Sequence, residues 1–125
     1  MKTLSTKDVI DFEPARVTAV LSNEEDIVVE LPEQPCFSQA DDNNPSAAPV
    51  YACEMRISEG KIELLDTNFP LETEYWEVKY EGGSRASFLP YNFTAHGPIK
   101  LTFFKGENNE PAIIVSGKQF SLEVL

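Results

Sequence analysis

Alternation of apolar and polar side chains with a period of two residues constrains the fold of this chain more than any other feature. In the segment 50–57, apolar side chains recur at every second position from Tyr51 to Ile57, with Glu54 and Arg56 between them. Successive side chains of a β-strand point to opposite faces, whereas a helix repeats every three to four residues. The segment is therefore predicted to be a strand with one buried and one wet face.

The same alternation recurs along most of the chain. It predicts further strands at 16–21, 27–31, 61–65, 75–81, 85–89, 99–103, 112–116 and 120–124. Short segments rich in turn-forming residues separate them, at 22–26, 58–60, 82–84, 106–109 and 117–118. In the turn 58–60 we expect Gly60 to take the positive φ that glycine adopts readily. The pattern also predicts that the Trp76 side chain points into the core.

The length and the strand pattern together predict one all-β domain over residues 1–125. Eight to nine short strands joined by tight turns are typical of an antiparallel β-sandwich or a partly open barrel. At 125 residues the chain is long enough to bury a hydrophobic core without stabilisation by disulfides or metal ions. At most one short N-terminal helix is expected, a single turn within Ser5–Phe12 that Ser5 or Thr6 could cap.

The segment 32–49 breaks the regular pattern. It holds four prolines and the polar run 41–44, with little apolar content. A proline has no N–H to donate to a strand ladder, so a central strand is not expected here. Long irregular segments of this kind are usually functional or mobile, and we predict a long surface loop.

Charge limits the classes of partner. The chain has 21 acidic and 10 basic residues, a net charge of −11 and a pI of about 4.4. Such a field repels phosphate backbones and anionic membranes, so neither nucleic acid nor a membrane surface is an expected partner. A basic protein is the partner that this charge favours. The alternative is that the negative charge only keeps the protein soluble.

Localisation and redox state follow from what the N-terminal sequence lacks. The first eight residues have no apolar stretch of the kind that signal peptides carry, and no apolar run approaches the ~20 residues of a membrane helix. We therefore expect a cytoplasmic protein in which Cys36 and Cys53 are reduced thiols. In an exported protein the two could pair instead.

Residues that carry catalysis or bind metals are sparse. A dyad of Cys36, in the predicted loop, with His96, the single histidine, is the one enzymatic hypothesis that the residue types allow. Zinc would need about four Cys or His ligands, and the run 41–44 lacks the spacing of a calcium loop. We predict no enzyme, no catalytic residue, no metal site and no cofactor.

One local resemblance concerns the segment 56–64. It resembles the second signature of PilZ domains, which are β-barrels that bind cyclic di-GMP, and so implies a barrel with that ligand. The family has Asp or Asn where this chain has Arg56, and Gly where it has Lys61. The family's paired arginines, which grip the nucleotide, have no counterpart, because Arg16 stands alone. A degenerate PilZ-like barrel is kept as an alternative that the acidic charge disfavours.

Aromatic residues outside the predicted strands supply the candidate binding site. Tyr91, Phe93 and His96 lie in the connection 90–98, and Phe69 lies in another loop. Loop aromatics on a rigid β-scaffold are suitable anchors for a partner, although they can also fold back onto the core. The leading hypothesis is a non-enzymatic module that binds another protein, of the immunity or inhibitor type. A small-ligand-binding barrel or sandwich and a structural subunit are the alternatives.

Overall fold

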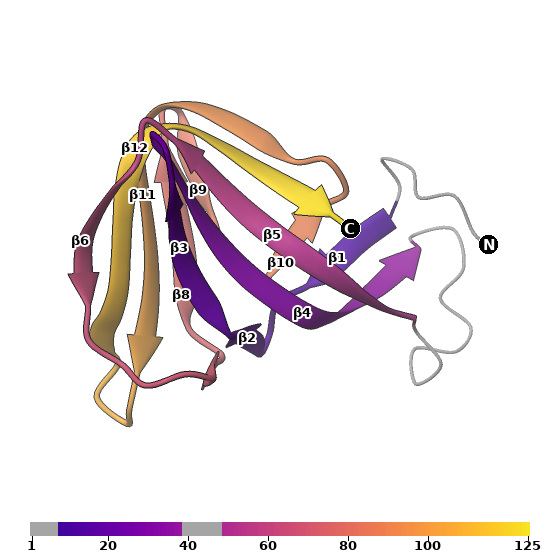
Figure 1. The fold of residues 1–125 in the computed structure, drawn as a ribbon. Coiled ribbons are helices and arrows are strands. Elements are labelled where there is room, and N and C mark those ends of the chain that lie inside the picture. Colours follow the sequence, from indigo (N-terminus) through magenta and orange to yellow (C-terminus); the bar gives the residue numbers. More distant parts are fainter. Residues whose placement is uncertain (1–7, 39–48) are drawn as a thin grey trace.

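A computed structural model describes residues 8–38 and 49–125 of the chain (Figure 1), and all statements on structure concern these two ranges. They contain strands and no helix, and hence no helix that could cross a membrane. The prediction of an all-β fold is confirmed. The strands are β1 (Asp8–Asp11), β2 (Ala15–Val17), β3 (Ala19–Asn23), β4 (Asp26–Ser38), β5 (Val50–Ser58), β6 (Lys61–Leu65), β7 (Leu71–Thr73), β8 (Trp76–Tyr80), β9 (Gly83–Arg85), β10 (Phe88–Pro90), β11 (Thr94–Lys105) and β12 (Glu110–Val124).

The strands form a nearly closed, barrel-like sheet, which is the second of the two predicted architectures. Its continuous path runs β10-β1-β4-β5-β12-β11-β8-β9, while β3 pairs with β4, β6 pairs with β12, and β2 and β7 form a small separate sheet. The two ends of the path, β9 and β10, follow each other in sequence, separated only by Ala86 and Ser87. The chain itself therefore bridges the two ends of the sheet.

The longest strand, β12, curves because it changes partner halfway along. Its residues 113–116 pair with β6, and its residues 119–124 pair with β5. Gly117 lies at the transition, where a Cβ atom would come within 2.3 Å of Ile57 Cγ2 and 2.7 Å of the Ser58 carbonyl oxygen. The predicted turn at 117–118 is therefore wrong: the strand continues, and the glycine allows two backbones to approach.

The turn between β5 and β6 also uses its glycine differently from the prediction. Glu59, and not Gly60, has the positive φ, at 49°. A Cβ atom on Gly60 would lie 2.8 Å from both Ile27 Cγ1 and the Ile57 carbonyl oxygen. The Gly60 N–H donates to the carbonyl of Glu25 at 2.8 Å, which ties this turn to the β3–β4 turn. Gly60 is thus required for close packing.

The predicted loop 32–49 is wrong for residues 32–38, which belong to β4, whereas 39–48 lie outside the described residues. Pro32 falls in a bulge between Leu31 and Gln34, where the ladder to β5 is interrupted and no N–H is needed. The buried Gln34 side chain supplies other hydrogen bonds at this point. Its amide nitrogen donates to the carbonyls of Asp11 (2.7 Å) and Pro14 (3.1 Å), and its oxygen accepts the Arg16 N–H (2.9 Å).

The predicted N-terminal helical turn is wrong for residues 8–11, which form β1 between β4 and β10. Ile10 and Phe12 are both fully buried, with the half-buried Asp11 between them, so the period here is that of a strand. The earlier residues of the proposed turn, 5–7, lie outside the described residues.

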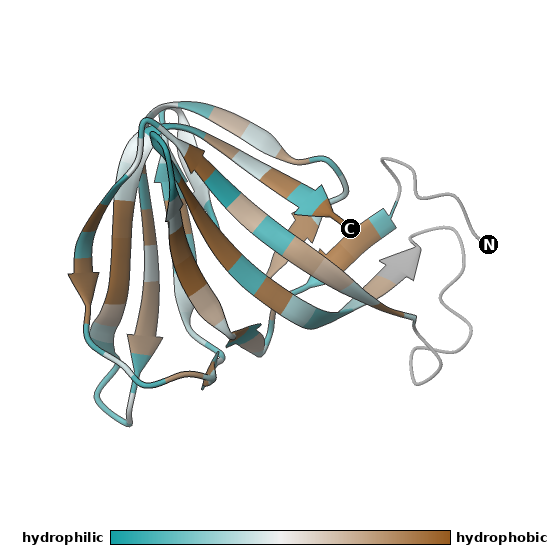
Figure 2. Ribbon diagram, in the orientation of Figure 1, coloured by the Kyte–Doolittle hydropathy of each residue, from teal (hydrophilic) through white to brown (hydrophobic). Residues whose placement is uncertain are grey.

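Large apolar side chains fill the inside of the barrel. Phe12, Phe103, Phe120 and Met55 are completely buried, and Trp76, 3% exposed, confirms the prediction that it points inward. Figure 2 shows the underlying alternation as brown and teal bands along the long strands. Within the described ranges, buried side chains therefore form a core inside the barrel.

Replacement of Gly117 by alanine tests the close approach at the bend of β12. Because the branched Ile57 side chain and the Ser58 carbonyl oxygen stand where the new methyl group would lie, we expect Gly117→Ala to lower the free energy of unfolding by about 3 kcal/mol, measured by urea denaturation. The control is Gly83→Ala, where the nearest atom is the flexible Tyr80 hydroxyl at 3.4 Å, with an expected loss below about 0.5 kcal/mol. Equal stability of the two variants would contradict the packing described.

Candidate functional site

The predicted aromatic site is divided between two places. Tyr91 and Phe93 lie in the turn between β10 and β11, and His96 is an exposed residue of β11 rather than of a loop. Phe69 lies in the connection from β6 to β7, at the other end of the barrel (Figure 1). The structure thus brings three of the four residues to one region.

Phe93 packs against the core at its end of the barrel. Its half-buried ring lies 5.8 Å from the ring of Tyr80 and 5.9 Å from that of Phe120, between ring centroids. The guanidinium carbon of Arg85 stands 5.0 Å from the centroid of the same ring, which is cation–π geometry. Phe93 therefore helps to close this end of the barrel, and its ring is already covered by Arg85.

The two cysteines have the environment of packing residues. Cys36, expected in an exposed loop, is instead 3% exposed within β4 and pairs with Ile10 of β1. Cys53 on β5 is 1% exposed. Burial, with a smaller contribution from the charge of Cys36, raises the pKa of Cys53 to about 12. The dyad hypothesis required an exposed, activated thiol, and neither cysteine has that environment.

Thiol labelling tests this assignment. We expect neither cysteine of the native protein to react with a thiol-specific reagent at pH 8, and Cys53 to stay unreactive at pH 9, because its pKa lies near 12. In guanidinium chloride both should react at once, which serves as the control. A native thiol that reacts as fast as a small-molecule thiol would contradict the buried positions.

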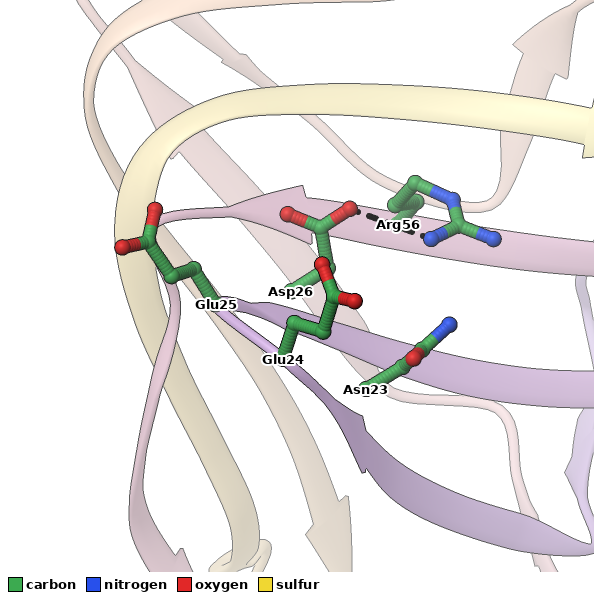
Figure 3. Close-up of a pocket in the computed structure, with 5 residues that line it drawn as sticks. All are labelled: Asn23, Glu24, Glu25, Asp26 and Arg56. Atoms are coloured by element: carbon green, nitrogen blue, oxygen red, sulfur yellow. Dashed lines mark hydrogen bonds and ion pairs between the residues drawn. The ribbon is translucent and has the colours of Figure 1, made fainter.

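A charged hollow of about 560 Å³ lies over the β3–β4 turn and is lined by Asn23, Glu24, Glu25, Asp26 and Arg56. Figure 3 shows the Asp26 carboxylate facing the Arg56 guanidinium, whereas the Glu25 side chain points away from it. Arg56 lies 3.1 Å from Asp26 and 3.5 Å from Glu123, and the hydrogen bond that it donates to Asp26 raises the pKa of Arg56. Arg56, the cation that lines this hollow, is thus already paired twice.

A second hollow, of about 290 Å³, combines aromatic and acidic side chains, and we call it the aromatic–acidic pocket. It forms where β8, the end of β11, the β1–β2 connection and the β9–β10 connection meet. Its lining residues are Glu13, Glu74, Tyr75, Trp76, Glu77, Ala86, Ser87 and Phe104. Unlike the hollow over the β3–β4 turn, it offers both ring surface and several carboxylates.

Backbone hydrogen bonds through Phe12 hold the pocket together. The Trp76 indole N–H donates to the Phe12 carbonyl at 2.9 Å, and the Phe12 N–H donates to the Ser87 carbonyl at 2.7 Å. Trp76 also packs edge-on against the Phe12 ring at 5.6 Å and stacks on Phe103 at 6.1 Å. Three segments distant in sequence are therefore fixed relative to one another.

Tyr75 is an exposed aromatic residue with a fixed backbone. Its side chain is 57% exposed. Its N–H donates to the Thr73 hydroxyl oxygen, that hydroxyl donates to the Tyr75 carbonyl, and the same carbonyl accepts the Phe104 N–H at 3.0 Å. The ring is consequently presented to solvent from a rigid position.

The pocket is electrically negative. Within the described ranges, the carboxylates of Glu13 and Glu74 have no ion-pair partner, while Glu77 is 3.5 Å from the ammonium of Lys79. Burial raises the pKa of the neighbouring Asp11; a hydrogen bond from the Glu13 N–H opposes this, and the charge of Glu13 adds to it. A cation entering the pocket would relieve this repulsion.

Sequence reasoning missed the pocket, although one signal was present. Tyr75 and Glu77 fall on the outward face of the strand predicted over 75–81, which places an aromatic ring and a carboxylate together on a solvent-facing surface. Phe104 reaches Tyr75 through the pairing of β11 with β8, and Glu13, from the β1–β2 connection, lies beside them only where the two ends of the sheet meet. Among the described residues no group of three or more potential ligands could hold a metal ion.

Comparison with known proteins finds no matching family model, no matching curated protein and no matching solved structure. The resemblance of the segment 56–64 to the PilZ signature therefore stays a prediction. Inferences about function rest on the chemistry of the chain itself.

Proposed function

We propose that this protein is a non-enzymatic domain that binds a basic protein partner, with the aromatic–acidic pocket as a principal contact site. The observation that carries the proposal is the combination in one hollow of exposed ring surface with three carboxylates, of which Glu13 and Glu74 have no ion-pair partner within the described ranges. Unpaired carboxylates beside aromatic surface are complementary to a basic side chain with an apolar stem.

The overall charge supports the same class of partner. A net charge of −11 attracts a basic protein over distance and raises its association rate, while it repels acidic competitors. A basic nuclease or toxin that this domain neutralises is the specific form of partner that fits such a field. The pocket then adds what bulk charge lacks, namely a defined place and orientation for contact.

Rigid presentation of Tyr75 adds a second line of support. Ordering a flexible side chain or loop on binding costs about 0.5–1.5 kcal/mol per side chain, and the backbone of Tyr75 is already fixed by hydrogen bonds to Thr73 and Phe104. Such pre-organised aromatic residues are the usual anchors of protein interfaces. The fully buried residues that fill the inside of the barrel favour binding at this outer surface over binding of a small ligand inside.

Neutralising the two unpaired carboxylates tests the proposal. We expect Glu13→Gln/Glu74→Gln to weaken binding of a blocked peptide containing both lysine and arginine by about tenfold, since each partly exposed pair contributes up to about 1 kcal/mol. Binding is measured by isothermal titration calorimetry at about 0.15 M salt. At this salt, charges more than about 8 Å from the peptide are largely screened, so the affinity reports mainly on charges close to it.

The matched control is Glu24→Gln/Glu25→Gln, which makes the same change in net charge on the exposed β3–β4 turn. We expect less than about a twofold effect for this pair. If both double variants weaken binding equally, or if the wild-type protein does not bind the peptide, the pocket is not the contact site and the proposal fails.

A further inference from the structure

The aromatic–acidic pocket has features that select among basic side chains. We propose that it takes a lysine side chain of the partner, whose ammonium replaces that of Lys79 beside Glu77. This inference rests on the proposed function. It adds that the entering group is a lysine ammonium and that this ammonium displaces Lys79 from Glu77.

The origin of the three carboxylates favours an ammonium over a guanidinium. Glu13 comes from the β1–β2 connection, Glu74 from the β7–β8 connection and Glu77 from β8 itself, so they border the pocket from separate segments. An ammonium has three donors that diverge in space, and it can therefore face several acceptors at once. A guanidinium has its donors in one plane and fits best against a single carboxylate in a bidentate pair.

The size and walls of the pocket match one long, narrow side chain. A volume of about 290 Å³ lies just below the range of pockets that hold drug-sized ligands, which is about 300–1,000 Å³. The aromatic residues Tyr75 and Phe104 can cover the methylene stem of a lysine while the carboxylates receive its charge. A single side chain, not a whole peptide segment, is the group that this hollow accommodates.

Lys79 already makes the contact that the incoming lysine would make. Its ammonium lies 3.5 Å from the Glu77 carboxylate, and its side chain is 59% exposed against 35% for Glu77. Lys100 lies directly opposite Lys79 on the neighbouring strand β11, and like charges in this arrangement repel. The ion pair of Lys79 with Glu77 is thus long, exposed and weak. A lysine of the partner can therefore replace Lys79 at little cost in free energy.

A peptide series read out by the single tryptophan of the chain tests the inference. Trp76 lines the pocket, so its fluorescence reports on occupancy. The probes are blocked glycine–serine peptides with one central lysine, arginine or acetyl-lysine. We expect the lysine peptide to bind most tightly, the arginine peptide about threefold more weakly, and the acetyl-lysine peptide at least about tenfold more weakly.

Variants of the two lysines test the exchange. Lys79→Gln is expected to bind the lysine peptide about threefold more tightly than the wild type, because Glu77 is no longer occupied. Lys118→Gln removes the same charge from a distant exposed pair with Glu59 and should change the affinity less than about 1.5-fold.

The outcomes separate this inference from the proposed function. If arginine binds as tightly as lysine while Glu13→Gln/Glu74→Gln still weakens binding, the preference for lysine is wrong and the proposed function stands. If Lys79→Gln leaves the affinity unchanged or lowers it, the exchange at Glu77 is wrong. If no peptide of the series and no basic peptide binds, the proposed function fails with it.

Discussion

The buried hydrogen bond from the Trp76 indole to the Phe12 carbonyl joins parts of the chain that the sheet leaves unconnected. Together with the bond from the Phe12 N–H to the Ser87 carbonyl, it links the end of β1 and the start of β8 to the short connection between β9 and β10. This is where the two ends of the strand path meet. Because these groups are buried, loss of either bond would leave an unsatisfied polar group and cost about 1–3 kcal/mol. Closure of the barrel and construction of the aromatic–acidic pocket thus depend on the same contacts.

Curvature is the second requirement of a barrel made from so few residues, and two devices provide it. Gly117 and Gly60 allow β12 and the β5–β6 turn to approach β5 and β4 more closely than any Cβ would permit. In β4, a bulge at Pro32 interrupts the ladder, and the Gln34 side chain supplies hydrogen bonds to neighbouring backbone. Each device exchanges a regular strand interaction for a bend, and each keeps the buried polar groups satisfied.

Period-two alternation was sufficient to predict the fold class and most of the strands, because it reflects local burial. It failed where long-range contacts decide the conformation. The glycine at 117 looks like a turn in sequence, and only its contact with Ile57 explains a continuous strand. Pro32 is incompatible with a regular central strand, and the bulge and the Gln34 bonds that accommodate it cannot be seen in sequence. The pocket escaped prediction for the same reason, since Phe104 reaches Tyr75 by long-range strand pairing and Glu13 joins them only where the two ends of the sheet meet.

In our proposal, this acidic domain binds basic groups at one place and not over its whole surface. Amide NMR spectra of the isotope-labelled protein, recorded during titration with a basic peptide at physiological salt, test it most directly. We expect shifts concentrated at the Trp76 indole N–H and at the amides of Tyr75, Ser87 and Phe104, with little change at the β3–β4 turn, which also carries three carboxylates. Shifts spread evenly over both regions would contradict it and would leave only a non-specific attraction of opposite charges.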